Sequence, residues 1–157
     1  VIHLLDLCEK LDSVDTKNIN MFGVSRGGMM TYETLREGRR IHKAVVVAGV
    51  ADCTMNYEER EDMRSLLTEL IGGTPEQLPE EYSRRSAVEW ADEINTPLLV
   101  FHTTGDDKVS IKQADKLVKQ LKKYQKDYEY VTFESNIHGD LRKTDVERIR
   151  KFFETGT

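Results

Sequence analysis

The chain has 157 residues, of which 38% are hydrophobic, and it carries a formal net charge of −5. This length is typical of one domain, and no apolar run reaches the ~20 residues that a membrane span needs. The acidic balance disfavours proteins that bind nucleic acid chiefly through phosphates, and a polybasic membrane anchor is absent. We therefore expect neither nucleic acid nor a membrane as a partner.

The first predicted element is a helix over residues 1–11, where apolar residues recur at helical spacing. The sequence opens with Val1 inside this helix, without the basic region or cleavage site of a signal peptide. We therefore expect the native chain to extend upstream of Val1. A strand over 17–24 and a helix over 29–37 follow, and Gly38 is placed to end that helix as its C′ residue.

The run at 43–50 is almost continuously apolar, which is typical of a strand buried on both faces of a parallel sheet. The charged segment 57–93 follows. It is predicted to contain a helix over 57–71, a loop over 72–81 and short helical turns over 82–93. This segment is longer than an ordinary crossover, and long insertions often cover a site, so we expect a lid or one wall of a substrate site. Tyr82 and Trp90 are candidates for that wall, with a core position favoured for Trp90.

The remaining predicted elements are a strand over 97–102, an amphipathic helix over 110–124, a strand over 128–133 and a helix over 144–153 with Thr144 as its N-cap. Strands that alternate with helices imply right-handed crossovers and a parallel sheet. We predict an α/β fold: one domain over 1–157, with a mostly parallel sheet of about four strands and flanking helices.

The strongest local motif is Gly23-Val24-Ser25-Arg26-Gly27-Gly28, a G-x-S-x-G pattern between a predicted strand and a predicted helix. A strand-to-helix turn this tight strains the backbone of the serine, and glycines two before and two after it remove side chains that would collide. The turn lifts the hydroxyl of Ser25 clear of the sheet, as a nucleophile requires. The N–H of Arg26 opens the new helix and is positioned to stabilise an oxyanion.

A serine nucleophile needs a base, and the base needs a carboxylate that orients it. Asp106 follows the predicted strand at 97–102, and His138 follows the strand at 128–133, so both come after the serine in the expected chain order. Because the carboxyl ends of parallel strands share one edge of a sheet, these side chains could converge with Ser25. Asp107 and Asp52 remain alternative acids. His102 ends its strand beside the candidate acid, and we expect it to make a structural hydrogen bond.

The two cysteines, Cys8 and Cys53, cannot form a disulfide framework, and neither lies in a metal-ligand spacing. They favour a reducing compartment such as the cytoplasm. Serine hydrolysis uses no metal and no organic cofactor, so we expect none here.

The motifs resemble the α/β-hydrolase fold and, more narrowly, the catalytic domain of the prolyl oligopeptidase family of serine peptidases. That family shows G-x-S-x-G-G, then P-x-L-x-x-H-G-x-x-D-x-x-V, then a late H-G. The matching segments here are Gly23–Gly28, Pro97–Val109 and His138-Gly139. Tyr82–Val88 also resembles the family's Y-x-x-x-S-P-x stretch, with Ala87 in place of Pro. Thr103 departs from the pattern, which has Gly there.

The resemblance implies the acid at Asp106, the base at His138 and a substrate-binding role for Lys108. It implies a peptide or small-ester substrate, cleaved through an acyl-enzyme. It also implies a fold of about eight strands, of which this sequence would be the C-terminal half, without the loop that donates the second oxyanion-hole group. We expect this piece alone to have weak activity or none.

The strand that carries Ser25 would then be an exposed edge, open to a missing N-terminal half or to a second copy in a homodimer. The alternative function is accordingly a non-catalytic α/β module that acts through protein pairing at this open edge. The sequence does not choose between a peptidase and an esterase.

Overall fold

The computed structural model describes residues 1–38 and 41–154, which contain a four-stranded parallel sheet in the order β1-β2-β3-β4. The strands are β1 (Met21–Val24), β2 (Ala44–Val47), β3 (Leu98–Thr103) and β4 (Tyr128–Phe133). Since all the strands run in the same direction, their carboxyl ends lie along one edge of the sheet. The predicted α/β fold with a parallel sheet is confirmed.

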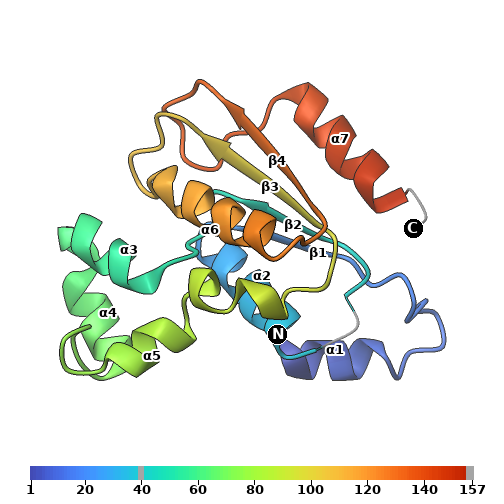
Figure 1. Ribbon diagram of the computed structural model, residues 1–157. Helices are drawn as coiled ribbons and strands as arrows, with labels where there is room; N and C mark the ends of the chain where they lie inside the picture. Colours follow the sequence, from blue (N-terminus) through green and yellow to red (C-terminus); the bar gives the residue numbers. More distant parts are fainter. Residues whose placement is uncertain (39–40, 155–157) are drawn as a thin grey trace.

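The helices cover both faces of the sheet, giving three layers (Figure 1). They are α1 (Ile2–Cys8), α2 (Arg26–Arg36), α3 (Cys53–Glu59), α4 (Arg64–Ile71), α5 (Pro79–Arg84), α6 (Lys112–Lys123) and α7 (Lys143–Glu154). Helices α2 and α6 lie against one face and α7 against the other. Helices α3, α4 and α5 form a separate group on the side toward which the strand arrows point (Figure 1).

Strands β2 and β3 are buried along their whole length. Because successive side chains of a strand point to opposite faces, each of these strands supplies both cores. Val46 and Val100 pack with α2 and α6, whereas Val45 and Phe101 pack with the α7 side. The apolar runs of the sequence therefore mark the two central strands, and the helices on either face exclude water from them.

Strand β1 begins later than predicted, at Met21. The carboxylate of Asp15 accepts a hydrogen bond from Lys17 N at 3.0 Å and another from the Asn18 side chain, which forms a turn where a strand was expected. Strand β1 is an edge of the sheet in the described residues, as predicted, and Phe22 on it is 47% exposed.

The segment 57–93 is also divided differently from the prediction. Helix α3 begins earlier than the helix expected over 57–71, with Asp52 as its N-cap. The expected helix is then interrupted at Arg60, because the backbone of this residue leaves the helical region at φ −115° and ψ 79°. Pro79, expected in a loop, is instead the first residue of α5, a position where its missing N–H costs nothing. Tyr82 and Trp90 are both buried. The core position of Trp90 is confirmed, and neither side chain lines an exposed wall.

None of the helices in 1–38 and 41–154 combines the length and the apolar character that crossing a membrane requires.

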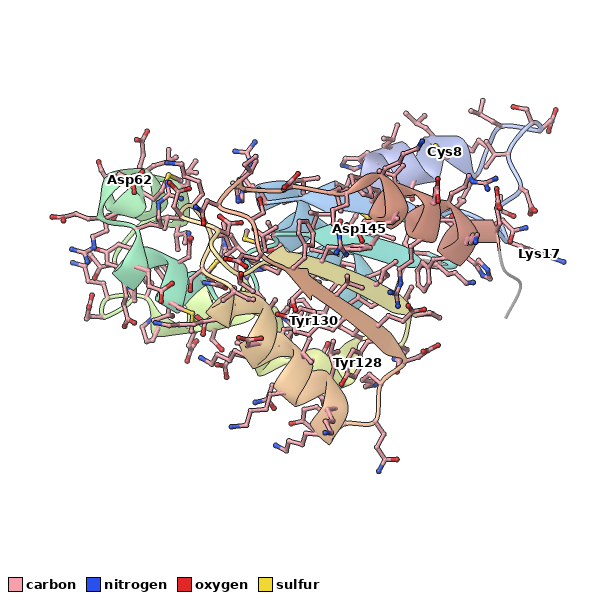
Figure 2. The ribbon with its side chains drawn as sticks, turned by 90° about the horizontal axis from the view of Figure 1, so that it is seen from above. Cys8, Lys17, Asp62, Tyr128, Tyr130 and Asp145 are labelled. Carbon is pink, nitrogen blue, oxygen red and sulfur yellow. The ribbon has the colours of Figure 1, made fainter. Side chains whose placement is uncertain are left out.

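Helix α7 begins at Lys143, so the prediction of Thr144 as its N-cap is wrong. Asp145 takes over the capping function: its buried carboxylate accepts hydrogen bonds from Arg142 N at 2.9 Å and from the Arg142 guanidinium at 2.7 and 2.8 Å. The hydrogen bonds from Arg142 hold the pKa of the Asp145 carboxyl below its usual range, although burial opposes them. Figure 2 shows Asp145 on this helix.

Replacing Asp145 by Asn should lower the free energy of unfolding by about 1–2 kcal/mol at neutral pH. A carboxyl whose folded pKa is depressed stabilises the fold above its ordinary pKa and loses that contribution as the pH falls through the folded value. The difference between D145N and the parent should therefore shrink below about pH 4. Urea unfolding at several pH values measures it, with the exposed Glu147→Gln as the matched control. A difference that grows on acidification would contradict the expected role.

Candidate active site

Ser25 occupies the turn between β1 and α2 with φ 56° and ψ −120°, a conformation that non-glycine residues rarely adopt. The turn is held on both sides: Ser25 N donates to Val47 O at 2.9 Å, and Ser25 O accepts from Gly28 N at 2.9 Å. Strain of this kind persists only where the surrounding structure enforces it, and it is concentrated at functional sites.

The glycines around Ser25 serve different purposes. A Cβ on Gly23 would lie 2.3 Å from Gly27 O, and a Cβ on Gly28 would lie 2.6 Å from Val46 Cγ1 and 2.7 Å from Gly49 Cα. A Cβ on Gly27 would meet nothing within 4 Å. The steric argument made from the sequence is therefore right for Gly23 and wrong for Gly27. Gly28 is the second position where a side chain is excluded, because α2 packs there directly on β2.

Asp106 lies beyond β3, and its side chain is completely buried. Its Oδ1 accepts from Lys108 N at 2.9 Å and from Val109 N at 3.0 Å, and the carboxylate receives His138 Nδ1 at 2.8 and 3.0 Å. Burial alone would raise the pKa of the Asp106 carboxyl. The hydrogen bonds from Val109, His138 and Lys108 outweigh burial and place this pKa below its usual range. Asp106 is thus an ionised acceptor that holds one nitrogen of His138.

The loop that carries His138 follows β4 and reaches back across the sheet to β1. Gly139 has a φ of 70°, and a Cβ built on it would lie 3.0 Å from Val24 Cγ1. Since Val24 precedes Ser25, the loop of His138 lies against the strand end that presents the serine. The structure therefore brings Ser25, Asp106 and His138 to one edge of the sheet.

Thr103, which departs from the family pattern, helps to fasten this loop. Its hydroxyl donates to Ile137 O at 3.3 Å. Gly105 adds a second link through its N–H, which donates to Ser135 O at 3.1 Å. The β-branched residue therefore supports the loop of the base.

His102 is 1% exposed, and its Nε2 lies 2.7 Å from Val109 O and 3.6 Å from Asp106 Oδ2. Burial lowers the pKa of its imidazole, against the opposing effects of Val109 O and Asp106. Since a carbonyl oxygen can only accept, the proton is assigned to Nε2. Its Nδ1 is buried without a hydrogen-bond partner in the described residues. The expected structural hydrogen bond is confirmed.

The recorded contacts of the two alternative acids are with residues other than His138. Asp52 accepts from Met55 N at 2.9 Å as the N-cap of α3, and it pairs with Lys116. The side chain of Asp107 is 68% exposed and lies 3.8 Å from Lys108 Nζ. Of the three candidate carboxylates, the structure joins Asp106 to the histidine.

The remaining predicted site residues are Arg26 and Lys108. Arg26 is the first residue of α2, where a backbone N–H has no partner within its own helix. The side chain of Lys108 is 57% exposed.

A further residue contacts the loop of the acid: Arg60 Nη1 donates a hydrogen bond to the backbone carbonyl of Lys108 at 2.6 Å. Arg60 was missed by the sequence reasoning, because a backbone acceptor far along the chain leaves no motif.

Within residues 1–38 and 41–154, no cluster of three or more His, Cys, Asp or Glu side chains has the arrangement of a metal site.

Comparisons with known proteins bear on the family and the fold. The model of the prolyl oligopeptidase family matches residues 1–155. The chain is 37% identical over 131 residues to the uncharacterized peptidase YtmA of Bacillus subtilis, covering 81% of this chain and 51% of YtmA. It is 28% identical over 152 residues to the uncharacterized peptidase YuxL of the same organism, covering 96% of this chain and 23% of YuxL.

Among solved structures, a puromycin-hydrolyzing peptidase of Mycobacterium tuberculosis matches with a TM-score of 0.86 and 24% identity, covering 94% of this chain and 22% of that one. This likeness shows the fold. Compared with the two curated relatives, the chain spans about half the length of YtmA and about a quarter of the length of YuxL.

Proposed function

The chain belongs to the prolyl oligopeptidase family, and from that premise we propose that it acts as a serine peptidase with Ser25 as nucleophile, His138 as general base and Asp106 as the carboxylate that orients the base. One observation carries the proposal: His138 Nδ1 lies 2.8 Å from Asp106 Oδ2, in a loop so near β1 that a Cβ on Gly139 would lie 3.0 Å from Val24 Cγ1.

The chemistry follows from the hydrogen bonds. Ionised Asp106 accepts the Nδ1–H of His138, so the lone pair of Nε2 is free to take the Ser25 hydroxyl proton. Ser25 Oγ then attacks the carbonyl carbon of the peptide bond. When the tetrahedral intermediate collapses, the C–N bond breaks, His138 returns the proton to the leaving amine, and an acyl ester remains on Ser25. Water, activated by His138, attacks this ester and releases the acid.

Two further groups are proposed to act on the substrate. The N–H of Arg26 stabilises the developing oxyanion, an interaction whose loss typically costs about 10²–10³ in rate. Lys108 presents its exposed ammonium beside the acid and is the candidate substrate contact. The segment 57–93 forms a wall of the site, and its link to the acid loop is the hydrogen bond of Arg60. Because the named relatives are peptidases, the proposed substrate is a peptide.

Labelling with a fluorophosphonate probe tests the nucleophile. The full-length protein should be labelled, the modified peptide should contain Ser25, and the Ser25→Ala variant should not react. The exposed Ser65 on α4 offers the matched control, and S65A should be labelled like the parent. Equal labelling of the parent and S25A would overturn the assignment. A folded parent that neither reacts nor hydrolyses peptides would favour a non-catalytic pairing role at the β1 edge.

A further inference from the structure

The loop 106–109 is held through its carbonyl groups as well as through its N–H groups. Lys108 N and Val109 N both donate to Asp106 Oδ1. The carbonyls of the same two residues accept hydrogen bonds from side chains outside the loop. The peptide unit that joins Lys108 to Val109 is therefore held at both ends, its N–H by Asp106 and its C=O by Arg60. The carbonyl that His102 holds belongs to the next peptide unit.

Arg60 holds the first carbonyl from the solvent side. Its Nη1 donates to Lys108 O at 2.6 Å, while Nε and Nη2 donate to the carboxylate of Asp62 at 2.8 and 2.7 Å. The guanidinium is thereby oriented by a two-pronged ion pair at the end of α3. Figure 2 shows Asp62 in the group of helices beside the sheet.

The loop is not fixed by close packing on this side. A cavity of about 180 Å³ lies between the end of α3 and the acid loop, and Arg60, Asp106 and Lys108 are among its lining residues. Where such a space separates two segments, dispersion contacts cannot fix their distance. The hydrogen bond of Arg60 spans the gap and transmits the position of α3 to the loop.

His102 holds the second carbonyl from inside the protein. Its Nε2 lies 2.7 Å from Val109 O, and its ring is buried between β3 and the loop. The ring is also 3.6 Å from Asp106 Oδ2, beyond a hydrogen bond. His102 therefore acts on the acid through the backbone and leaves the carboxylate free to hold His138.

We propose that Arg60 and His102 are positioning residues that clamp Lys108 O and Val109 O from opposite sides and thereby aim Asp106 at His138. The proposal rests on the proposed function. Its physical basis is that both N–H donors to Asp106 Oδ1 belong to the clamped residues. A loop released from the clamp lets the carboxylate move relative to the imidazole, and a misplacement of about 1 Å can cost about 10²-fold in rate.

The Arg60 side is tested in the full-length protein with Arg60→Met, and Arg150→Met on α7 is the matched control. R60M should lower kcat for a peptide substrate up to about 10²-fold with KM little changed. R150M makes the same substitution but removes only an exposed ion pair with Glu154, and should stay within about threefold of the parent. Equal kcat for R60M and the parent, or an equal loss in R150M, would overturn the role of Arg60.

The His102 side is tested by rescue. His102→Leu removes the donor and should lower kcat, whereas the side-chain amide of His102→Gln can donate to Val109 O and should restore most of it. Melting temperatures identify variants that are merely unfolded. If a folded H102Q is as slow as a folded H102L, the hydrogen bond from residue 102 to Val109 O does not position Asp106.

A spectroscopic measurement separates this proposal from the proposed function. The Nδ1–H proton resonance of His138 reports its hydrogen bond to Asp106 without any turnover. It should weaken or shift in R60M and H102L and persist in R150M and H102Q. An unchanged resonance in R60M and H102L overturns the clamp even in an active enzyme. An inactive parent with the expected resonance pattern refutes the peptidase assignment and supports the clamp.

Discussion

Replacing Asp106 by Asn is expected to lower kcat by about 10⁴-fold while the protein stays folded. The carboxylate accepts three hydrogen bonds, from Lys108 N, Val109 N and His138 Nδ1. An Asn can satisfy the two loop N–H groups with its carbonyl oxygen, but its NH₂ group then faces His138. That donor favours the tautomer with Nδ1 unprotonated and the proton on Nε2, where it blocks transfer from Ser25.

The neighbouring Asp107 is the control for this experiment. Its side chain is 68% exposed and is paired only loosely, at 3.8 Å, with Lys108. Asp107→Asn should therefore keep kcat within about twofold of the parent, as exposed substitutions usually do. Steady-state kinetics on a peptide substrate and a thermal melt of each variant provide the measurement. If D107N loses as much activity as D106N, or if D106N keeps a tenth of the parent rate, Asp106 is not the orienting acid.

The arrangement of the strands was predictable from the sequence because burial on both faces leaves a simple pattern. The runs at 43–50 and 97–102 contain β2 and most of β3, and β4 has the predicted bounds Tyr128–Phe133. The boundaries that failed depend on polar side chains that bond locally. Asp15 turns the chain before β1, and Asp52 begins α3 ahead of the helix predicted from residue 57. These side-chain bonds compete with regular structure and leave no periodicity.

The residues of the candidate site that follow strand ends or belong to motifs were predictable from the sequence. Ser25, Asp106 and His138 each follow a different parallel strand, so the topology alone brings them to one edge. The choice of Asp106 over Asp107 came from the resemblance, and the structure joins Asp106 to the histidine. Arg60 escaped the sequence reasoning because it bonds a main-chain oxygen 48 positions away. Any residue type can supply such an acceptor, so no sequence pattern marks it.

The motif contains Gly23 and Gly27 as equivalent positions, but the structure shows that of the two only Gly23 lacks room for a side chain. Replacing Gly23 by Ala is expected to lower the free energy of unfolding by about 3 kcal/mol. The new Cβ would lie 2.3 Å from Gly27 O and 2.6 Å from Gly27 C. These are backbone atoms in the first turn of α2, so relief requires the turn of Ser25 to open. We expect probe labelling of Ser25 to fall together with stability.

Gly27→Ala is the matched comparison, because it adds the same methyl group four residues away. Nothing lies within 4 Å of a Cβ at Gly27. Alanine is also the better helix former by up to about 1 kcal/mol, so G27A should be at least as stable as the parent. Urea unfolding of both variants decides the point: a G27A protein as unstable as G23A would mean that the motif acts through both glycines equally. The expected difference means that the motif's two glycines are not sterically equivalent, and that the space needed for the strained serine is kept on the strand side of the turn.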